Sequence, residues 1–251
     1  MFTFALNPYT MNFDYWKWLH NLQSTGTKYF MLAGGAFLFF YILFPKAFSG
    51  IRIQKLFPKR KDHYRDVFFS FISMMIFATV AYVVFTTLRP YNHIQYGTIT
   101  QYGVVWFWLS FVWMFFLHDA YFYWMHRLMH LPFLFKHVHL IHHKSTNPSP
   151  WTAYAFHPLE AVMEAGIVPL IAFTLPINRV AFTSFMIFQL SYNVYGHLGY
   201  EILQPIANTK IGRWLNTSTA HNMHHKYFKG NYGLYTRIWD RGLKTNREMD
   251  A

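Results

Sequence analysis

Uncharged apolar runs alternate with short basic or polar segments along this chain. Residues 29–45 carry no charge and are bounded by Lys28 and Lys46, and residues 67–88 form a second uncharged run. A helix needs about 20 consecutive, mostly apolar residues to cross the hydrocarbon core of a bilayer. The pattern therefore predicts membrane-spanning helices rather than the core helices of a soluble protein.

A third apolar segment, residues 103–117, is dense in Trp and Phe. No helix-breaking residue follows it at once, so we expect it to continue as one helix through His130 and to leave the bilayer near His118. The helix would then carry polar side chains at its end, just outside the hydrocarbon.

A helical hairpin is predicted next. Residues 161–175 form a weaker apolar segment that Pro169 interrupts, residues 180–200 carry no charge, and the turn at residues 176–178 joins the two. Together these segments predict an all-α fold, an integral membrane helical bundle of about four to five transmembrane helices. We expect residues 1–251 to form a single membrane domain.

The composition fits a lipid environment and limits the chemistry. Hydrophobic residues make up 53% of the chain, charged residues 13% and aromatic residues 22%, and aromatic rings accumulate at membrane interfaces. Residues 1–28 lack the apolar core of a signal peptide, so we interpret them as an interfacial N-terminal lead-in. The chain has no Cys, which excludes disulfides, iron–sulfur clusters and thiolate zinc sites. Any metal site must use His, carboxylate or amide ligands.

The formal net charge of +12 orients the bundle. Nucleic-acid binding would account for a basic chain, but the apolar runs argue against it, and basic cytoplasmic loops account for the same charge. Residues 46–66 are rich in Lys and Arg, which predicts a cytoplasmic loop. Counting crossings from it places residues 118–160 and the chain after Tyr200 on the same side. The membrane would be a bacterial inner membrane or the endoplasmic reticulum.

Most of the 15 histidines fall between His118 and His225, in three clusters. His126 and His130 are four residues apart and share one face of a helix. The other two clusters repeat the pattern His-x-x-His-His, as His139, His142 and His143 and as His221, His224 and His225. Adjacent helix residues diverge by about 100°, so neighbouring rings can serve two metal ions. The spacing predicts a dinuclear centre in a histidine-lined cap on the cytosolic side.

A redox metal centre explains these clusters better than three alternatives do, namely isolated interfacial residues, a loose metal-binding tail and a structural zinc site. A lone histidine in a membrane protein is often an interfacial residue, which we expect for His20, His63 and His93. A loose metal-binding tail would not be embedded in aromatic, apolar sequence. A structural zinc site closes with four ligands and has no redox chemistry. We therefore favour a pair of iron ions, since imidazole suits iron.

These residues resemble the three histidine boxes of the fatty acid hydroxylase/sterol desaturase superfamily. Details similar to its sterol-desaturase branch are Asp119 with Tyr123-Trp124, His157-Pro158-Leu159-Glu160, Asn193 to His197, and Gly230-Asn231-Tyr232-Gly233 leading to Trp239-Asp240. The resemblance covers residues 100–241, which we take as the catalytic region. It implies a cytosolic dimetal site that uses O2 and electrons from an external donor, either cytochrome b5-like or a ferredoxin with its reductase.

The resemblance also implies the ligands. They are His126, His130, His139, His142, His143, His221, His224 and His225, with His197 as a ninth. Some members of the superfamily have His-x-x-x-His where this chain has Asn193 to His197, so the ligand at 193 is lost, becomes an amide oxygen or is replaced. His157 is the candidate replacement, or else it supports a ligand. No catalytic residue beyond the metal ligands is predicted.

Three carboxylates are candidates to orient ligand imidazoles through the second ring nitrogen, namely Asp119, Glu160 and Asp240. The alternative for each is an interfacial charge paired with a cation such as Arg127 or Arg237. His118 is expected near the substrate entrance, and His137 is not expected to be a ligand.

The predicted function is O2-dependent hydroxylation or desaturation of a C–H bond of a lipid or sterol-like substrate that enters from the bilayer, in lipid biosynthesis. Hydroxylation and desaturation differ only in sub-ångström positioning, so both stay open. The alternative is a membrane metal-binding or metal-transport protein without oxygenase activity. Transport would place ionisable ligands along a path at mid-membrane depth, whereas these clusters are predicted at one rim.

Overall fold

The first helical segment is longer than the sequence pattern indicates. The computed structural model describes residues 13–95, 97–98, 101–207 and 209–247. Within it, α1 (Tyr15–Tyr29) runs through a π-helical turn, α2 (Gly35–Phe37) and a second π-helical turn to Leu43. Asp14 caps the start, because its carboxylate accepts the Lys17 N–H at 3.1 Å. The expected interfacial lead-in is therefore the first half of this helix from Tyr15 on, and residues 1–12 lie outside the described part.

Two more long helices follow, as predicted. α3 (Arg60–Tyr82) continues through a π-helical turn to Thr87, and α4 (Gly103–Met129) is one uninterrupted helix. Among the described residues, the segments 15–43, 60–87 and 103–129 are long and apolar enough to cross a membrane. Their outward side chains, such as Met31, Phe68 and Trp108, are large, apolar and exposed. Such a surface needs lipid rather than water around it, so this is a membrane protein.

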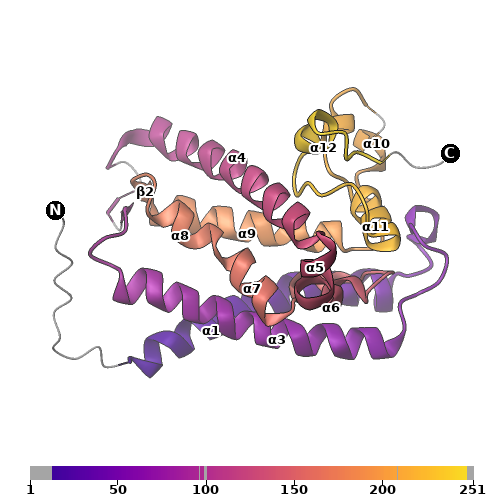
Figure 1. Cartoon of the computed structure of the whole chain (residues 1–251), viewed down its shortest axis with the longest axis horizontal. Coiled ribbons are helices and arrows are strands. Elements are labelled where there is room, and N and C mark those ends of the chain that lie inside the picture. Colours follow the sequence, from indigo (N-terminus) through magenta and orange to yellow (C-terminus); the bar gives the residue numbers. More distant parts are fainter. Residues whose placement is uncertain (1–12, 96, 99–100, 208, 248–251) are drawn as a thin grey trace.

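The predicted hairpin lies beside these helices (Figure 1). It consists of α7 (Pro158–Ala165), α8 (Ile167–Ala172) and α9 (Arg179–Gly196). The first arm breaks at Gly166 rather than at Pro169, because Pro169 sits in the first turn of α8, where a missing N–H costs nothing. Three described helices meet the length and apolarity of a span, so a count of four or five crossings remains a prediction that depends on this hairpin.

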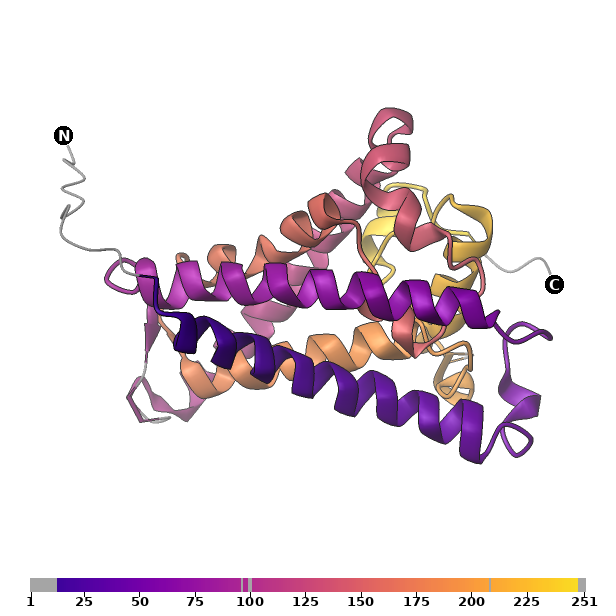
Figure 2. The same ribbon diagram turned by 90° about the horizontal axis from the view of Figure 1, so that it is seen from below.

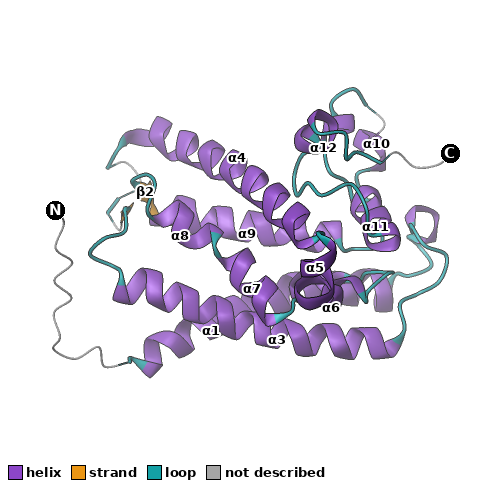
Figure 3. Ribbon diagram, in the orientation of Figure 1, coloured by secondary structure: helices purple, strands orange, loops and turns teal. Residues whose placement is uncertain are grey.

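Two short parallel strands close one end of the bundle. β1 (Ile94–Gln95) pairs with β2 (Ile177–Asn178), with Ile94 opposite Ile177. Figure 3 shows these strands beside loops at the end where the described chain begins. They tie the connection after α3 to the turn between α8 and α9.

The opposite end carries a cap of short elements. These are α5 (Pro132–Leu134), a π-helical turn (Phe135–His139), α6 (Leu140–His143), α10 (Gln204–Ala207), α11 (Ser218–Tyr227) and α12 (Ile238–Gly242), with 3-10 turns at Ser49–Ile51, Pro150–Tyr154 and Gly212–Trp214. The basic loop between the first two long helices reaches the same end (Figure 2). The predicted clustering of basic loop and histidine-bearing segments at one end is therefore seen.

Two groups of buried apolar side chains hold the cap on the bundle. One includes Met114, Ile171 and Phe185, and joins α4, α8 and α9. The other includes Tyr29 and Met74 and packs α1 and α3 against residues 150–156. The segments that carry histidines thus rest on a fixed scaffold.

Candidate metal centre

Nine histidines from four separate segments converge in two groups at the cap. The first group is His126, His130, His139, His143 and His224, and the second is His142, His197, His221 and His225. Within each group the candidate ligand atoms lie within 4.8 Å of one another. All nine are buried except His130, which is partly buried. The arrangement can hold two metal ions.

The adjacent histidines separate as their spacing predicts. His142 joins the second group and His143 the first, while His224 joins the first and His225 the second. The ring planes are 88° apart in both pairs. The divergence of neighbouring helix positions therefore places each pair across both groups.

Five of these rings have a fixed orientation because Nδ1 lies beside an oxygen acceptor. The main-chain carbonyls of Tyr232, Asn193, Gly230 and Ser145 accept from His126, His197, His224 and His225 at 2.7–3.0 Å. The carboxylate of Glu160 accepts from His139 at 2.6 Å. A neutral imidazole that donates through Nδ1 has a bare lone pair on Nε2, so these contacts select the tautomer that can bind a metal.

The Nε2 atoms then face each other. Nε2 of His143 lies 3.1–3.2 Å from Nε2 of His130, His139 and His224. Nε2 of His197 lies 3.0–3.2 Å from Nε2 of His142, His221 and His225.

This convergence fits metal ions better than hydrogen bonds. His197 and His225 both donate through Nδ1, so the neutral rings have no proton to share between their Nε2 atoms. The buried Nε2 of His126 has no hydrogen-bond partner among the described residues. Two nitrogens bound to one ion at about 2.1 Å and at right angles lie about 3 Å apart. The donor set therefore suits one ion in each group.

Electrostatics keep these imidazoles ready to bind a cation. Burial first, and neighbouring imidazoles second, hold the pKa values of His139, His142 and His143 well below the usual value for histidine. The same causes lower the pKa values of His221, His224 and His225. The rings are neutral at physiological pH, which is the form that a metal ion needs.

His157 and Asn193 lie outside both groups. His157 caps α7, where its Nδ1 accepts the Leu159 N–H at 3.3 Å. The amide of Asn193 donates to the carbonyl of Ala153 at 2.7 Å, and only its main-chain oxygen takes part, as the acceptor for His197. Neither side chain is placed to complete the donor set. His137 is exposed and also lies apart.

The three predicted carboxylates divide in their roles. Glu160 contacts the imidazole of the candidate ligand His139 directly, whereas Asp119 and Asp240 bind loop groups instead. Asp119 accepts from the main chain of Tyr235 and from both N–H and O–H of Thr236. Asp240 accepts the N–H of Tyr232 at 2.9 Å. The carbonyl of the same Tyr232 accepts from Nδ1 of His126, so Asp240 contacts this candidate ligand only through Tyr232.

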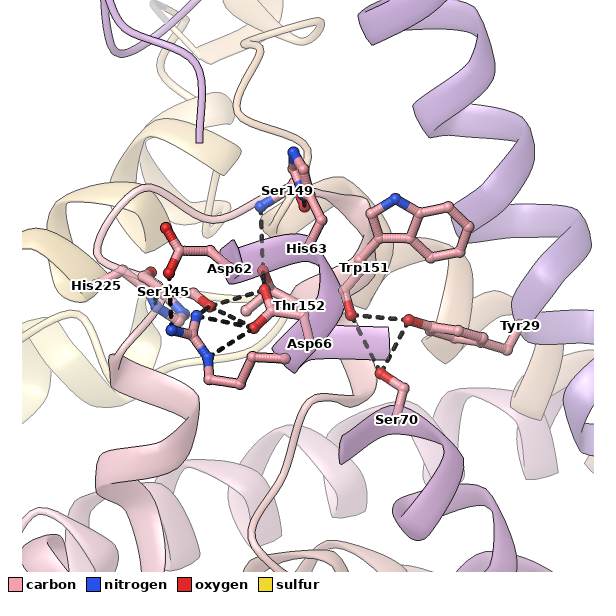
Figure 4. Close-up of polar contacts among 11 residues, drawn as sticks. Tyr29, Asp62, His63, Asp66, Ser70, Ser145, Ser149, Trp151, Thr152 and His225 are labelled. Carbon is pink, nitrogen blue, oxygen red and sulfur yellow. Dashed lines mark hydrogen bonds and ion pairs between the residues drawn. The ribbon is translucent and has the colours of Figure 1, made fainter. Parts of the chain in front are cut away.

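The sequence pattern missed Asp66, a buried carboxylate at the start of α3. It accepts from Ser145 and Thr152 at 2.7–2.8 Å and pairs with Arg65 at 2.9 Å. Figure 4 shows this network, and Ser145 in turn offers its carbonyl to His225. An Asp at the end of a basic loop resembles an ordinary interfacial charge, so only its position before a long apolar run could have drawn attention to it.

A large cavity lies beside the two histidine groups, although none of the nine histidines lines it. Its volume is about 870 Å³, and it is lined by residues of α1, α3, α4 and α7 to α9. At one end it reaches Phe156 and Asn193, and the ring of Phe156 lies 5.2 Å from that of His142. His118 lines the cavity, and its Nδ1 lies 2.9 Å from the hydroxyl of Tyr235.

Known proteins similar to this chain include sterol-modifying enzymes. A Delta(7)-sterol 5(6)-desaturase of Leptosphaeria maculans is 36% identical over 49% of the chain and 33% of its own length. Another, of Gibberella zeae, is 25% identical over 91% of the chain and 71% of its own length. Human lathosterol oxidase is 31% identical over 56% of the chain and 46% of its own length. The chain thus spans only about a third of the first relative and under half of the human one, and no solved structure matches it.

The family comparison covers the site itself. A model described as fatty acid hydroxylase matches residues 111–245, which is more than half of the 251 residues and includes all nine converging histidines. The chain therefore belongs to the fatty acid hydroxylase family, within the fatty acid hydroxylase/sterol desaturase superfamily.

Proposed function

We propose that this protein is a membrane oxidoreductase that uses two iron ions and O2 to hydroxylate or desaturate a C–H bond of a sterol-like lipid. One observation carries the proposal: two groups of buried, neutral imidazoles lie beside a large cavity in a membrane protein, where the lining residue Phe156 packs against His142. A redox metal pair beside such a cavity can oxidise a lipid, whereas a transport path needs ligands at several depths.

The first group of five histidines would hold one iron and the second group of four the other. Two irons held there would supply what zinc lacks, namely the reduction of O2 to an oxidant that can remove hydrogen from an unactivated carbon. The chain's own contribution is to keep the Nε2 lone pairs free and aimed inward. Glu160 and four main-chain carbonyls do so by accepting the Nδ1 protons.

The cavity would position the substrate. Its lining follows α1 from Asp14 to Lys28 and α9 from Arg179 to Asn193, which corresponds to about 21 Å of helix in each case. An extended lipid fits this length, and apolar side chains such as Phe77, Phe85 and Phe182 line the cavity together with polar ones such as Lys28 and Glu164. The end next to His142 receives the carbon to be oxidised, so the rest of the molecule extends away from the cap.

The relatives indicate the substrate class. Two of them are named for a Delta(7)-sterol and one for lathosterol, so we infer that a Δ7-sterol or a similar fused-ring lipid occupies the cavity. Electrons would come from an external donor, cytochrome b5-like or a ferredoxin with its reductase. We place the cap on the cytosolic side because the basic loop lies at the same end.

The test combines metal analysis with sterol oxidation. Purified protein should contain two irons per chain, and cells that make it should convert added lathosterol to an oxidised product. His142→Ala and His224→Ala should each abolish conversion, because each removes a donor from a different group. His137→Ala is the matched control, since this exposed histidine lies outside both groups, and it should retain activity.

Different failures would contradict different parts. Protein without tightly held iron would contradict the metal assignment. Protein with two irons that leaves lathosterol unchanged but oxidises a fatty acyl chain would contradict only the sterol assignment. Full activity in both ligand variants would contradict the site.

A further inference from the structure

A second concavity, of about 490 Å³, lies at the cap and is lined by five arginines from four segments, since Arg237 and Arg241 both belong to the turn of α12. They are Arg52, Arg213, Arg237, Arg241 and Arg247. One acidic residue, Glu201, also lines it. None of the five is a candidate metal ligand, and the proposed oxidation does not use them.

The carboxylate of Glu201 bonds to neutral groups. Its Oε1 accepts from the hydroxyl of Tyr195 and the N–H of Leu203, and its Oε2 accepts from the N–H and hydroxyl of Thr219. All four donors are neutral. Five arginines and one glutamate therefore line the concavity, so basic residues outnumber acidic ones in the described part of its lining.

Aromatic rings hold three of the guanidinium groups in place. The guanidinium carbon of Arg52 lies 4.4 Å from the ring centre of Phe57, that of Arg241 lies 4.9 Å from Trp214, and that of Arg247 lies 5.2 Å from Tyr227. A guanidinium that lies over a ring uses its face and leaves its N–H edge available. The buried Nε of Arg241 has no hydrogen-bond partner in the described part of the chain. Fixed forks of N–H donors match the oxygens of phosphate.

Exposed apolar side chains border the arginines. Ile206, Ile211, Trp214 and Leu243 are all exposed, Ile211 by 75%, and they lie within a few residues of Ala207, Gly212, Arg213 and Arg241 of the lining. Apolar and aromatic side chains beside arginines are typical of the level where acyl chains meet lipid phosphates.

We propose that the arginine concavity binds phosphate oxygens, and that the apolar border favours the head group of an anionic phospholipid as their source. The ligand would lie against α11, because Thr219, Ala220 and Met223 line the concavity. The same helix presents His221, His224 and His225 to the metal groups. Phosphate binding would thus brace the helix that carries three metal ligands.

The first arm of the test uses a soluble phosphate. Purified protein in uncharged detergent is titrated with inorganic pyrophosphate by calorimetry, for the natural chain and for two triple variants. One variant carries Arg52→Gln, Arg213→Gln and Arg241→Gln. The control carries Lys55→Gln, Lys59→Gln and Lys61→Gln, which removes the same charge from exposed positions at the same end. The arginine variant should bind at least about tenfold more weakly, because each paired contact is charge-assisted, while the control should stay within about threefold.

The second arm identifies the source of the phosphate. Native mass spectrometry counts the phosphatidylglycerol or phosphatidylcholine molecules that the protein retains from mixed micelles. If the natural chain and the lysine control retain phosphatidylglycerol and the arginine variant does not, the phosphate belongs to a lipid head group. Pyrophosphate binding without such retention supports a soluble phosphate compound instead.

Three results would overturn the proposal. The first is equally weakened pyrophosphate binding in both triple variants, and the second is unchanged pyrophosphate binding in both. The third is an arginine variant that binds both probes normally but accepts electrons slowly from an acidic donor protein. If the glutamine triple variant loses its folded thermal transition, Arg→Lys at the same three positions replaces it. Lysine keeps the charge but loses the fork, so weaker pyrophosphate binding than in the natural chain still supports the site, and unchanged binding contradicts it.

Discussion

Glu160 is the one carboxylate among the described residues that contacts a ligand imidazole. It lies 2.6 Å from Nδ1 of His139, and both side chains are buried. The sequence predicted this role for Glu160, which stands in the short motif after His157. It predicted the same role for Asp119 and Asp240 and could not distinguish between the three. Those two bind loop main chain instead, and the partner of Asp119 is 116 residues away in the chain, which no spacing rule reveals.

Glu160→Leu should lower metal affinity, because the Nδ1 proton of His139 loses its acceptor and the ring loses its orientation. Loss of such a partner typically costs about 10- to 100-fold in affinity. Competition with a chelator measures it, with Glu160→Gln as the control that keeps an oxygen acceptor and should lose less. Equal affinity in the leucine variant and the natural chain would contradict this role.

Asp66→Asn should destabilise the folded protein by about 1.5–3 kcal/mol, because a buried carboxylate loses its charge-assisted bonds, including the pair with the partly exposed Arg65. The hydroxyls of Ser145 and Thr152 also lose a charged acceptor. Thermal unfolding in detergent measures the loss.

The matched control for Asp66 is Asp62→Asn. Asp62 pairs with the same Arg65 but is 20% exposed, and partly exposed pairs contribute about 1 kcal/mol or less. Similar losses in both variants would show that Asp66 is an ordinary surface charge.

At the scale of elements, the sequence predicted the histidine-bearing helices well and their connections less well. Uncharged runs and helix-face spacing located α3, α4 and α9 and the division of adjacent histidines. The break between α7 and α8 fell at Gly166 instead of Pro169. A contact distant in sequence lies at this point, because the hydroxyl of Tyr121 donates to the Met163 carbonyl. Local patterns carry no information about such a contact.

Gly166→Ala should therefore destabilise the protein by about 1–3 kcal/mol, the usual cost of overfilling a packed site. An added methyl group would overlap the hydroxyl of Tyr121 and crowd the Met163 carbonyl. Gly35→Ala is the control, since nothing lies within 4 Å of its added methyl and helical Ala is better than Gly by about 1 kcal/mol. Shifts of the unfolding midpoint in the same direction for both would refute the packing argument.

For the whole molecule, hydropathy and charge predicted that the basic loop and the histidines share one end, and Figure 2 shows the basic loop at the cap. The side of the membrane that the cap faces is still a prediction. The cavity and the supporting role of α3 could not be predicted, because both arise from packing between segments far apart in the chain.

Single cysteines can test the orientation, because the chain has none of its own. Lys55→Cys and Lys229→Cys should react with an impermeant thiol reagent from the same side of sealed vesicles, and Thr98→Cys only from the other. If residues 55 and 98 are labelled from the same side, the topology is contradicted. If residue 229 is labelled from the same side as residue 98, the cap and the basic loop lie on opposite sides of the membrane.

The division of His142 from His143 and of His224 from His225 has a consequence for metal loading. Each pair is rigidly joined through one peptide bond, yet its two rings belong to different groups. An ion that orders the first group also fixes the backbone of the second group. The second ion should therefore bind more tightly, because less conformational entropy is lost when it binds. Titration of metal-free protein should then be cooperative and show few half-loaded molecules, whereas two independent, stepwise occupancies would mean that the paired rings move separately.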